Sequence, residues 1–184
     1  MIQSKEDMKR FIMSDCCHHF GKDQRTWQIF KFVYDEEYLI VKYLEYLRKQ
    51  EYYINSFSRS KIKGFMSLLY ERKKNKIGKE LGLYIPPNCF EEGLTIWHQG
   101  TIIVNNNSKI GKRCTLHGNN CIGNNGKSEE CPVIGDDVDI GFGAVIIGDI
   151  TIADNVKIGA NSVVTKSIAE IGSIYAGVPA KRIK

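Results

Sequence analysis

The chain has 184 residues, enough for one large domain or two small ones, and its 42% hydrophobic and 26% charged residues are typical of a soluble globular protein. The net charge of +5 does not indicate nucleic acid, since a polyphosphate cofactor would suit it equally. The N-terminus lacks the apolar segment of a signal peptide, and no apolar run approaches the roughly 20 residues of a membrane helix. We therefore expect a cytoplasmic protein without a membrane-spanning segment or a nucleic-acid partner.

The six cysteines do not follow the paired CxxC spacing of a zinc site. In a chain without an export signal, disulfides are not expected. The sequence therefore predicts free, buried thiols and no required metal. The cysteines are Cys16, Cys17, Cys89, Cys114, Cys121 and Cys131.

Residues 1–82 predict a helical subdomain. A short helix begins at Ser4, a residue type that caps helix N-termini, and extends to about residue 14. A longer helix covers 36–51, where apolar residues recur at helical spacing. A third helix covers about 58–81 and ends near Gly82.

From residue 83 onward the sequence has a period of six. An aliphatic residue recurs on one phase, and the phase is kept across a single interruption of twelve residues. Such a repeat is stronger evidence for a fold than local propensity is. The repeated positions are Val104, Ile110, Leu116, Ile122, Ile134, Ile140, Ile146, Ile152, Ile158 and Val164.

This period predicts a mainly β fold, a left-handed parallel β-helix over residues 83–184 with a C-terminal tail. Each six-residue unit is a short strand and a turn, and three units close one triangular coil whose aliphatic residue points inward. Asn, Asp and Gly after the strands permit turns with positive φ, a role that fits the pairs 106–107, 119–120, 136–137, 154–155 and 160–161. About five coils fit between residues 84 and 174.

The repeat is interrupted at 124–131, a polar segment with no aliphatic residue to bury. We expect an external loop there. Loops on a rigid scaffold often carry function, although a surface excursion without a role is the alternative.

One segment resembles a known family. Residues 94–101 contain Trp97 and His98 and resemble the active-site segment of serine O-acetyltransferases and their capsule-biosynthesis relatives. The resemblance covers roughly residues 82–184, including 158–166 and 176–181. The last segment is common to many hexapeptide acyltransferases, whereas the His98 segment is narrower.

The resemblance implies an acetyl-CoA-dependent O-acetyltransferase with His98 as the general base. An imidazole with a pKa of about 6.5 can take the proton of a hydroxyl as it attacks a thioester. The alternatives for His98 are a structural histidine, in a non-catalytic scaffold, or a zinc ligand, as in carbonic anhydrases of this fold. A zinc site needs three histidines, and the repeats hold only His98 and His117.

The chain departs from serine acetyltransferases at three positions. The aspartate that pairs with the family's histidine corresponds to Leu83 or Tyr84, the acidic residue before the histidine is Trp97, and a second histidine corresponds to Cys131. These departures favour a saccharide hydroxyl in capsule or exopolysaccharide biosynthesis. Serine O-acetylation and N-acetylation of an amino sugar are the alternatives.

Further residues are candidates for the acceptor site. Trp97 provides an aromatic platform for a sugar or packs in an interface. Glu91, Glu92 or a backbone carbonyl is expected to orient His98. His117 either lines the same cleft or is an exposed turn residue, whereas His18 and His19 are expected at the surface or in packing.

The resemblance also implies a CoA site and an oligomer. CoA lies in a groove between subunits of relatives, so a homotrimer is expected, with a hexamer through the N-terminal helices left open. The aromatic and basic segment 52–63 packs on the β-helix or meets a membrane surface. The residues implied for CoA are Phe142, Ala160, Thr165, Lys166, Lys181 and Arg182.

Overall fold

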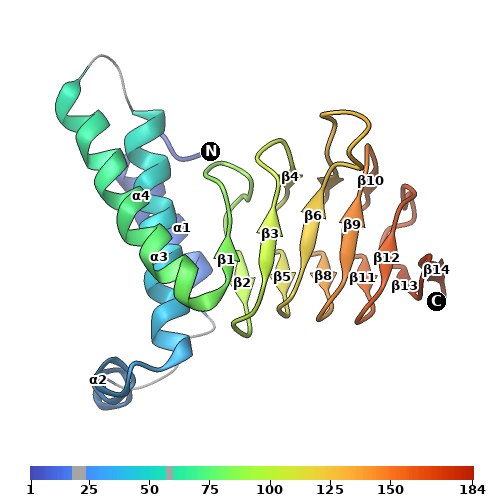
Figure 1. The fold of residues 1–184 in the computed structure, drawn as a ribbon, viewed down its shortest axis with the longest axis horizontal. Helices are drawn as coiled ribbons and strands as arrows, with labels where there is room; N and C mark the ends of the chain where they lie inside the picture. Colours follow the sequence, from blue (N-terminus) through green and yellow to red (C-terminus); the bar gives the residue numbers. More distant parts are fainter. Residues whose placement is uncertain (18–23, 57–59) are drawn as a thin grey trace.

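The computed structural model describes residues 1–17, 24–56 and 60–184, in which four helices cap one end of a β-helical prism (Figure 1). The expectations for His18, His19 and the start of the third helix lie outside the described residues. The predicted fold class, a left-handed β-helix with an N-terminal helical part, is confirmed.

The helices are α1 (Lys5–Asp15), α2 (Gln24–Val33), α3 (Glu36–Asn55) and α4 (Lys61–Leu81). The predicted start of α1 is confirmed, because the Asp7 amide donates to Ser4 Oγ at 2.9 Å and the Asp7 carboxylate accepts from the Ser4 amide at 3.1 Å. Helix α4 ends as predicted at Gly82, whose φ of 77° lets the chain turn into the first strand.

Helix α2 was not predicted from the sequence. Three of its apolar side chains lie on the outside, with Phe32 90% exposed beside Ile29 and Val33. The pattern was nevertheless present in the sequence, because Ile29, Phe32 and Val33 are three and four residues apart, the spacing of one face of a helix.

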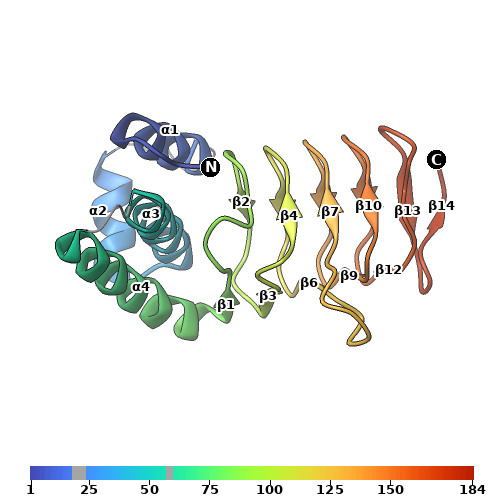
Figure 2. The same cartoon turned by 90° about the horizontal axis from the view of Figure 1, so that it is seen from above.

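The prism has three sheets of short parallel strands. Figure 2 shows the successive coils stacked from left to right. Only the last pair, β13 with β14, is antiparallel. The first sheet contains β1 (Leu83–Tyr84), β3 (Ile102–Val104), β6 (Cys121–Gly123), β9 (Val145–Ile147) and β12 (Val163–Val164). The second contains β4 (Lys109–Ile110), β7 (Val133–Ile134) and β10 (Thr151–Ile152). The third contains β2 (Thr95–Ile96), β5 (Thr115–Leu116), β8 (Asp139–Ile140), β11 (Lys157–Ile158), β13 (Ile174–Ala176) and β14 (Lys181–Arg182).

The core of the prism consists of the repeated aliphatic residues, and none of the ten is more than 3% exposed. Pairing in register stacks equivalent residues on one another, as in the column Leu116, Ile140 and Ile158. Four of the five expected turn pairs contain a residue at positive φ, namely Asn119, Asp137, Asn155 and Asn161 with φ between 53° and 59°, whereas Asn106 and Asn107 do not have positive φ. The phase of the repeat is therefore confirmed.

The helical cap is joined to the prism by a buried ionic network. Arg48 of α3 is fully buried, and its Nε donates to Asp15 at 2.6 Å while Nη1 donates to Glu51 at 2.9 Å. The guanidinium also donates to the backbone carbonyls of Phe90 and Glu91, at 2.9 and 2.8 Å. Buried residues of the helical cap and of the prism form one continuous cluster. The division of the chain into two domains, residues 1–82 and 83–184, therefore stays a prediction.

The tyrosines of segment 52–63 pack inside the cap. Tyr52 is 9% exposed, and Tyr53 stacks on Tyr70 with ring centroids 5.6 Å apart. Residues 57–59 of that segment lie outside the described part. In the described ranges 1–17, 24–56 and 60–184, no helix is long and apolar enough to cross a membrane.

All six cysteines are free, as predicted, but Cys17 is exposed and Cys121 half-buried rather than buried. Burial raises the pKa of the Cys16 and Cys89 thiols to about 12. The predicted loop between β6 and β7 is external, with residues 125–130 exposed.

Candidate active site

One corner of the prism, between the third and the first sheet, collects five of the eleven predicted site residues. Since β2, β5, β8 and β11 pair in register, the residues that follow each strand form two columns along this edge. The first column contains Trp97, His117, Gly141 and Gly159, and the second contains His98, Gly118, Phe142 and Ala160.

This register fixes approximate distances along the edge. Neighbouring strands in a sheet are about 4.8 Å apart, so Phe142 lies roughly 10 Å and Ala160 roughly 14 Å from His98 along the prism. The structure thus brings two of the predicted CoA residues onto the edge that carries the predicted base.

The carboxylate beside His98 comes from the helical cap. His98 Nδ1 lies 3.5 Å from Oε1 of Glu36, the first residue of α3, and the Gln99 amide donates to the other oxygen at 3.4 Å. A carboxylate at Nδ1 favours the tautomer with the proton on that nitrogen, which leaves the Nε2 lone pair free to accept a proton. The His98 side chain is 65% exposed and therefore accessible to substrates.

The expectation that Glu91 or Glu92 orients His98 is wrong within the chain. Glu92 Oε2 forms an ion pair with Arg10 Nε at 2.9 Å, and Glu91 lies 3.2 Å from the N-terminal ammonium. Both residues precede β2, whereas His98 follows it, so they lie at opposite ends of that strand. Glu36 is separated from His98 by 62 residues, and no local pattern in the sequence connects the two.

His117 and Trp97 lie side by side at the same corner. Their ring centroids are 6.5 Å apart, with 36° between the ring planes, and Trp97 is 43% exposed. His117 Nε2 is 2.8 Å from Oδ1 of Asp139, the residue of β8 that points outward beside Ile140. The structure thus places His117 next to the predicted base, and it adds Asp139, which sequence reasoning missed.

Other predicted residues lie elsewhere in the chain. Cys131 is buried at the end of the 124–131 loop, between the first and the second sheet. Thr165 and Lys166 follow β12 and lie on that same side of the first sheet. Within one chain, the first sheet therefore separates these three residues from His98.

The basic residues Lys181 and Arg182 form β14, at the end of the prism far from the helical cap (Figure 1). Arg182 pairs with Glu170 at 2.7 Å. Its guanidinium is thus partly neutralised, whereas no ion pair is found for Lys181 among the described residues.

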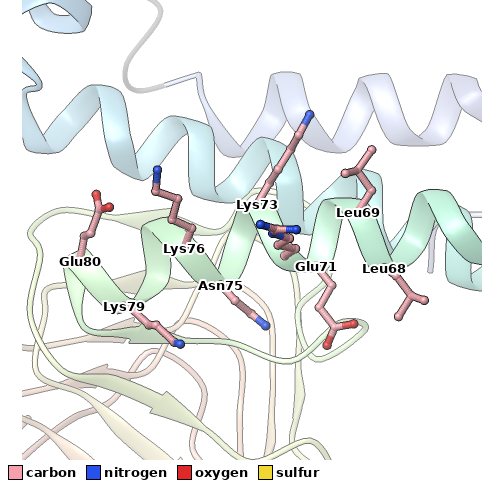
Figure 3. A pocket seen from close by; sticks show the side chains of 9 residues that line it. Leu68, Leu69, Glu71, Lys73, Asn75, Lys76, Lys79 and Glu80 are labelled. Atoms are coloured by element: carbon pink, nitrogen blue, oxygen red, sulfur yellow. The ribbon is translucent and has the colours of Figure 1, made fainter.

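A hollow of about 840 Å³ lies along α4 (Figure 3). Its nine lining residues, between Leu68 and Glu80, all belong to that one helix, so it is a surface between side chains rather than a cleft. Among the residues that the structure describes, no three His, Cys, Asp or Glu side chains are placed to hold a metal ion.

Comparison with known proteins agrees with this architecture. The family described as bacterial transferase hexapeptide (six repeats) matches residues 131–166. The chain is 30% identical over 139 residues to a serine acetyltransferase of Helicobacter pylori, covering 74% of this chain and 73% of that protein. It is 32% identical over 127 residues to a serine acetyltransferase of Staphylococcus xylosus, covering 63% of this chain but only 58% of that longer relative.

Solved structures show the same fold. Soybean serine acetyltransferase superposes with a TM-score of 0.72 at 20% identity, over 97% of this chain and 70% of that one. The serine acetyltransferase of Brucella abortus strain S19 in complex with coenzyme A superposes with a TM-score of 0.71 at 22% identity, over 97% and 68%. With its repeats, its His98 corner and the similarity to the Helicobacter protein over most of both chains, this chain belongs to the serine acetyltransferase family of hexapeptide-repeat acyltransferases.

Proposed function

We propose that the protein transfers an acetyl group from acetyl-CoA to a hydroxyl group, with His98 as the general base. The observation that carries the proposal is the exposed imidazole of His98 on the prism edge, with the Glu36 carboxylate 3.5 Å from Nδ1. Membership of an acyltransferase family supports the reaction class.

The chemistry needs no covalent acyl-enzyme. His98 Nε2 takes the acceptor proton while the acceptor oxygen attacks the thioester carbonyl, giving a tetrahedral intermediate. When the C–S bond breaks, the imidazolium returns that proton to the CoA thiolate. Glu36 stabilises the imidazolium formed between these two steps. Backbone N–H groups at the corner are suited to stabilise the oxyanion.

Acetyl-CoA is expected to lie along the edge that carries His98. Phe142 and Ala160 follow the base at intervals of one coil, a direction suited to an extended pantetheine arm. Lys181 lies toward the far end of the same sheet, where a cation suits phosphates. The Brucella relative has been solved with coenzyme A, which supports this choice of donor.

A trimer is part of the proposal because one prism face is apolar. Tyr84 and Ile103, which point outward from the first sheet, are 64% and 47% exposed, and Val145 and Val163 continue the row. In a closed trimer built on this face, the 124–131 loop side of one copy would meet the His98 side of the next. Cys131, Thr165 and Lys166 would then approach a neighbour's site. A hexamer formed through the N-terminal helices and a cytoplasmic location are further parts of the proposal.

The acceptor has two candidates. The similar proteins are named serine acetyltransferases, and this supports L-serine better than the saccharide favoured by the sequence departures. The specific observation in favour of a saccharide is Trp97, an exposed indole adjacent to the base.

A thiol-release assay tests the proposal. The protein is incubated with acetyl-CoA and either L-serine, a panel of neutral sugars or a panel of amino sugars, and free CoA is titrated. We expect acceptor-dependent release that is lost in His98→Gln. No release with any acceptor, together with no heat of acetyl-CoA binding in calorimetry, would instead support a non-catalytic scaffold.

A further inference from the structure

A polar groove of about 410 Å³ lies on the third sheet, next to the candidate active site. Its floor is the outward row of that sheet, in which Thr95 pairs with Thr115, Thr115 with Asp139, and Asp139 with Lys157. Ser14, near the end of α1, and Cys17, beyond that end, form one wall. The volume is within the range of small-molecule sites in proteins.

Two charged residues that line the groove, Arg113 and Asp137, already form an ion pair with each other. Arg113 donates to both oxygens of Asp137, and the hydrogen bond holds the pKa of the Asp137 carboxyl below its usual range. Among the described residues, no hydrogen bond or ion pair is found for the hydroxyl of Thr115 or the ammonium of Lys157, and Asp139, whose Oδ1 contacts His117, keeps Oδ2 for a ligand. This set of donors and acceptors suits a ligand with many hydroxyl groups.

The groove continues into the catalytic corner through one shared residue. Asp139 lines the groove and also contacts His117 Nε2 at 2.8 Å. His117 in turn lies beside Trp97, the residue before His98. A ligand in the groove can therefore extend past the His117 and Trp97 rings to the base without leaving the protein surface.

We propose that this groove binds a second sugar residue of an oligosaccharide acceptor, whose first residue presents its hydroxyl to His98. The proposal rests on the acetyl transfer proposed above. With Nε2–H donating to Asp139, His117 keeps Nδ1 as an acceptor for a neighbouring hydroxyl. The indole face of Trp97 packs against the apolar C–H surface of the first ring, while Thr115 and Lys157 hydrogen-bond the second.

Serine would use none of the groove. A single amino acid at His98 does not extend across two strands to the Lys157 ammonium, because Lys157 lies beyond β5 and β8 in the strand order. A gain in activity with acceptor length is therefore the property that separates the two acceptor classes.

The test compares kcat/KM for thiol release in pairs of acceptors that differ by one sugar residue: glucose with maltose, glucose with cellobiose, and galactose with lactose. For at least one pair, the wild type should favour the disaccharide about tenfold, the effect of one or two hydrogen bonds. The ratio of kcat/KM for the disaccharide to that for the monosaccharide should fall toward one in Lys157→Ala and in Thr115→Val. Lys109→Ala, which removes an outward lysine from the second sheet, should keep the wild-type ratio.

Two results overturn the inference and distinguish it from the proposed function. If L-serine is acetylated and no disaccharide is preferred, or if the preference survives in both groove variants, the groove does not bind the acceptor although acetyl transfer stands. If no acceptor releases CoA and acetyl-CoA does not bind, the proposed function fails as well.

Discussion

At the scale of single residues, the surroundings of His98 determine how well it can act as a base. Its side chain is largely exposed, and Glu36 is the carboxylate within reach of its ring among the described residues. The orientation and the tautomer of the His98 ring therefore depend on its contact with Glu36.

Substitution of the two residues should therefore give graded losses. His98→Gln removes the proton acceptor and should lower kcat about 10²–10⁴-fold. Glu36→Gln keeps the shape of the side chain but not its charge, and should lower kcat by up to about a hundredfold. Thiol-release kinetics at saturating acetyl-CoA measure both effects.

The matched control is Glu6→Gln, an exposed acidic residue of the first turn of α1. Its kcat should equal that of the wild type. Near-normal turnover in His98→Gln would show that the proton is taken by another group, for which His117 with Asp139 is the next candidate.

The sequence indicated His98 and Trp97 through the resemblance of their segment to serine acetyltransferases, and His117 because it directly follows the inward Leu116. It did not indicate Glu36 or Asp139. Glu36 contacts His98, a residue 62 positions away in the sequence. Asp139 occupies an outward position of the repeat, at which any polar residue is accommodated. Such contacts arise only from tertiary structure.

At the scale of elements, the junction between cap and prism depends on Arg48. Its guanidinium neutralises Asp15 and Glu51 inside the protein, while Asp15 Oδ1 also accepts from the amides of Gly93 and Leu94 at 2.8 and 2.9 Å. One side chain thus holds α1, α3 and the first coil together.

Arg48→Met should destabilise the protein by about 3–5 kcal/mol, because it leaves two buried carboxylates without their cation. Urea unfolding followed by circular dichroism measures the shift in midpoint. Arg182→Met, which removes an exposed pair with Glu170, is the control and should leave the midpoint nearly unchanged. Equal midpoints for the two variants would contradict the role given to Arg48.

The prism could be predicted almost completely from the sequence, because the ten buried positions on the repeat phase are all aliphatic. The buried positions two residues earlier are less regular and include Ser108, Asn120 and Ser162.

The cap was predicted less well. Helix α3 extends to Asn55 rather than residue 51, and α2 was missed although its apolar residues have helical spacing. Its apolar residues Ile29, Phe32 and Val33 lie on the outside, so the helix buries little of its apolar surface.

At the scale of the whole molecule, the apolar row on the first sheet predicts the oligomeric state. Val145→Glu places a charge in the middle of this face and should convert the proposed trimer to a monomer, as measured by light scattering after size exclusion. Thr151→Glu is the matched control on the second sheet, where the outward residues include Lys109, and it should remain trimeric. A wild-type protein that is monomeric at high concentration would contradict the proposed trimer.

The stacking of coils in register has a further consequence for the architecture. Asp139 and its partner Lys157 are 18 residues apart, the length of one uninterrupted coil. A chain carrying one more such coil beyond β11 would move its C-terminal lysine and arginine about 4.8 Å farther from His98 while leaving the base and its neighbours untouched. The number of coils thus sets the distance between His98 and the C-terminal cations. Adding or removing a coil would match the molecule to a longer or shorter acyl carrier without altering the catalytic residues.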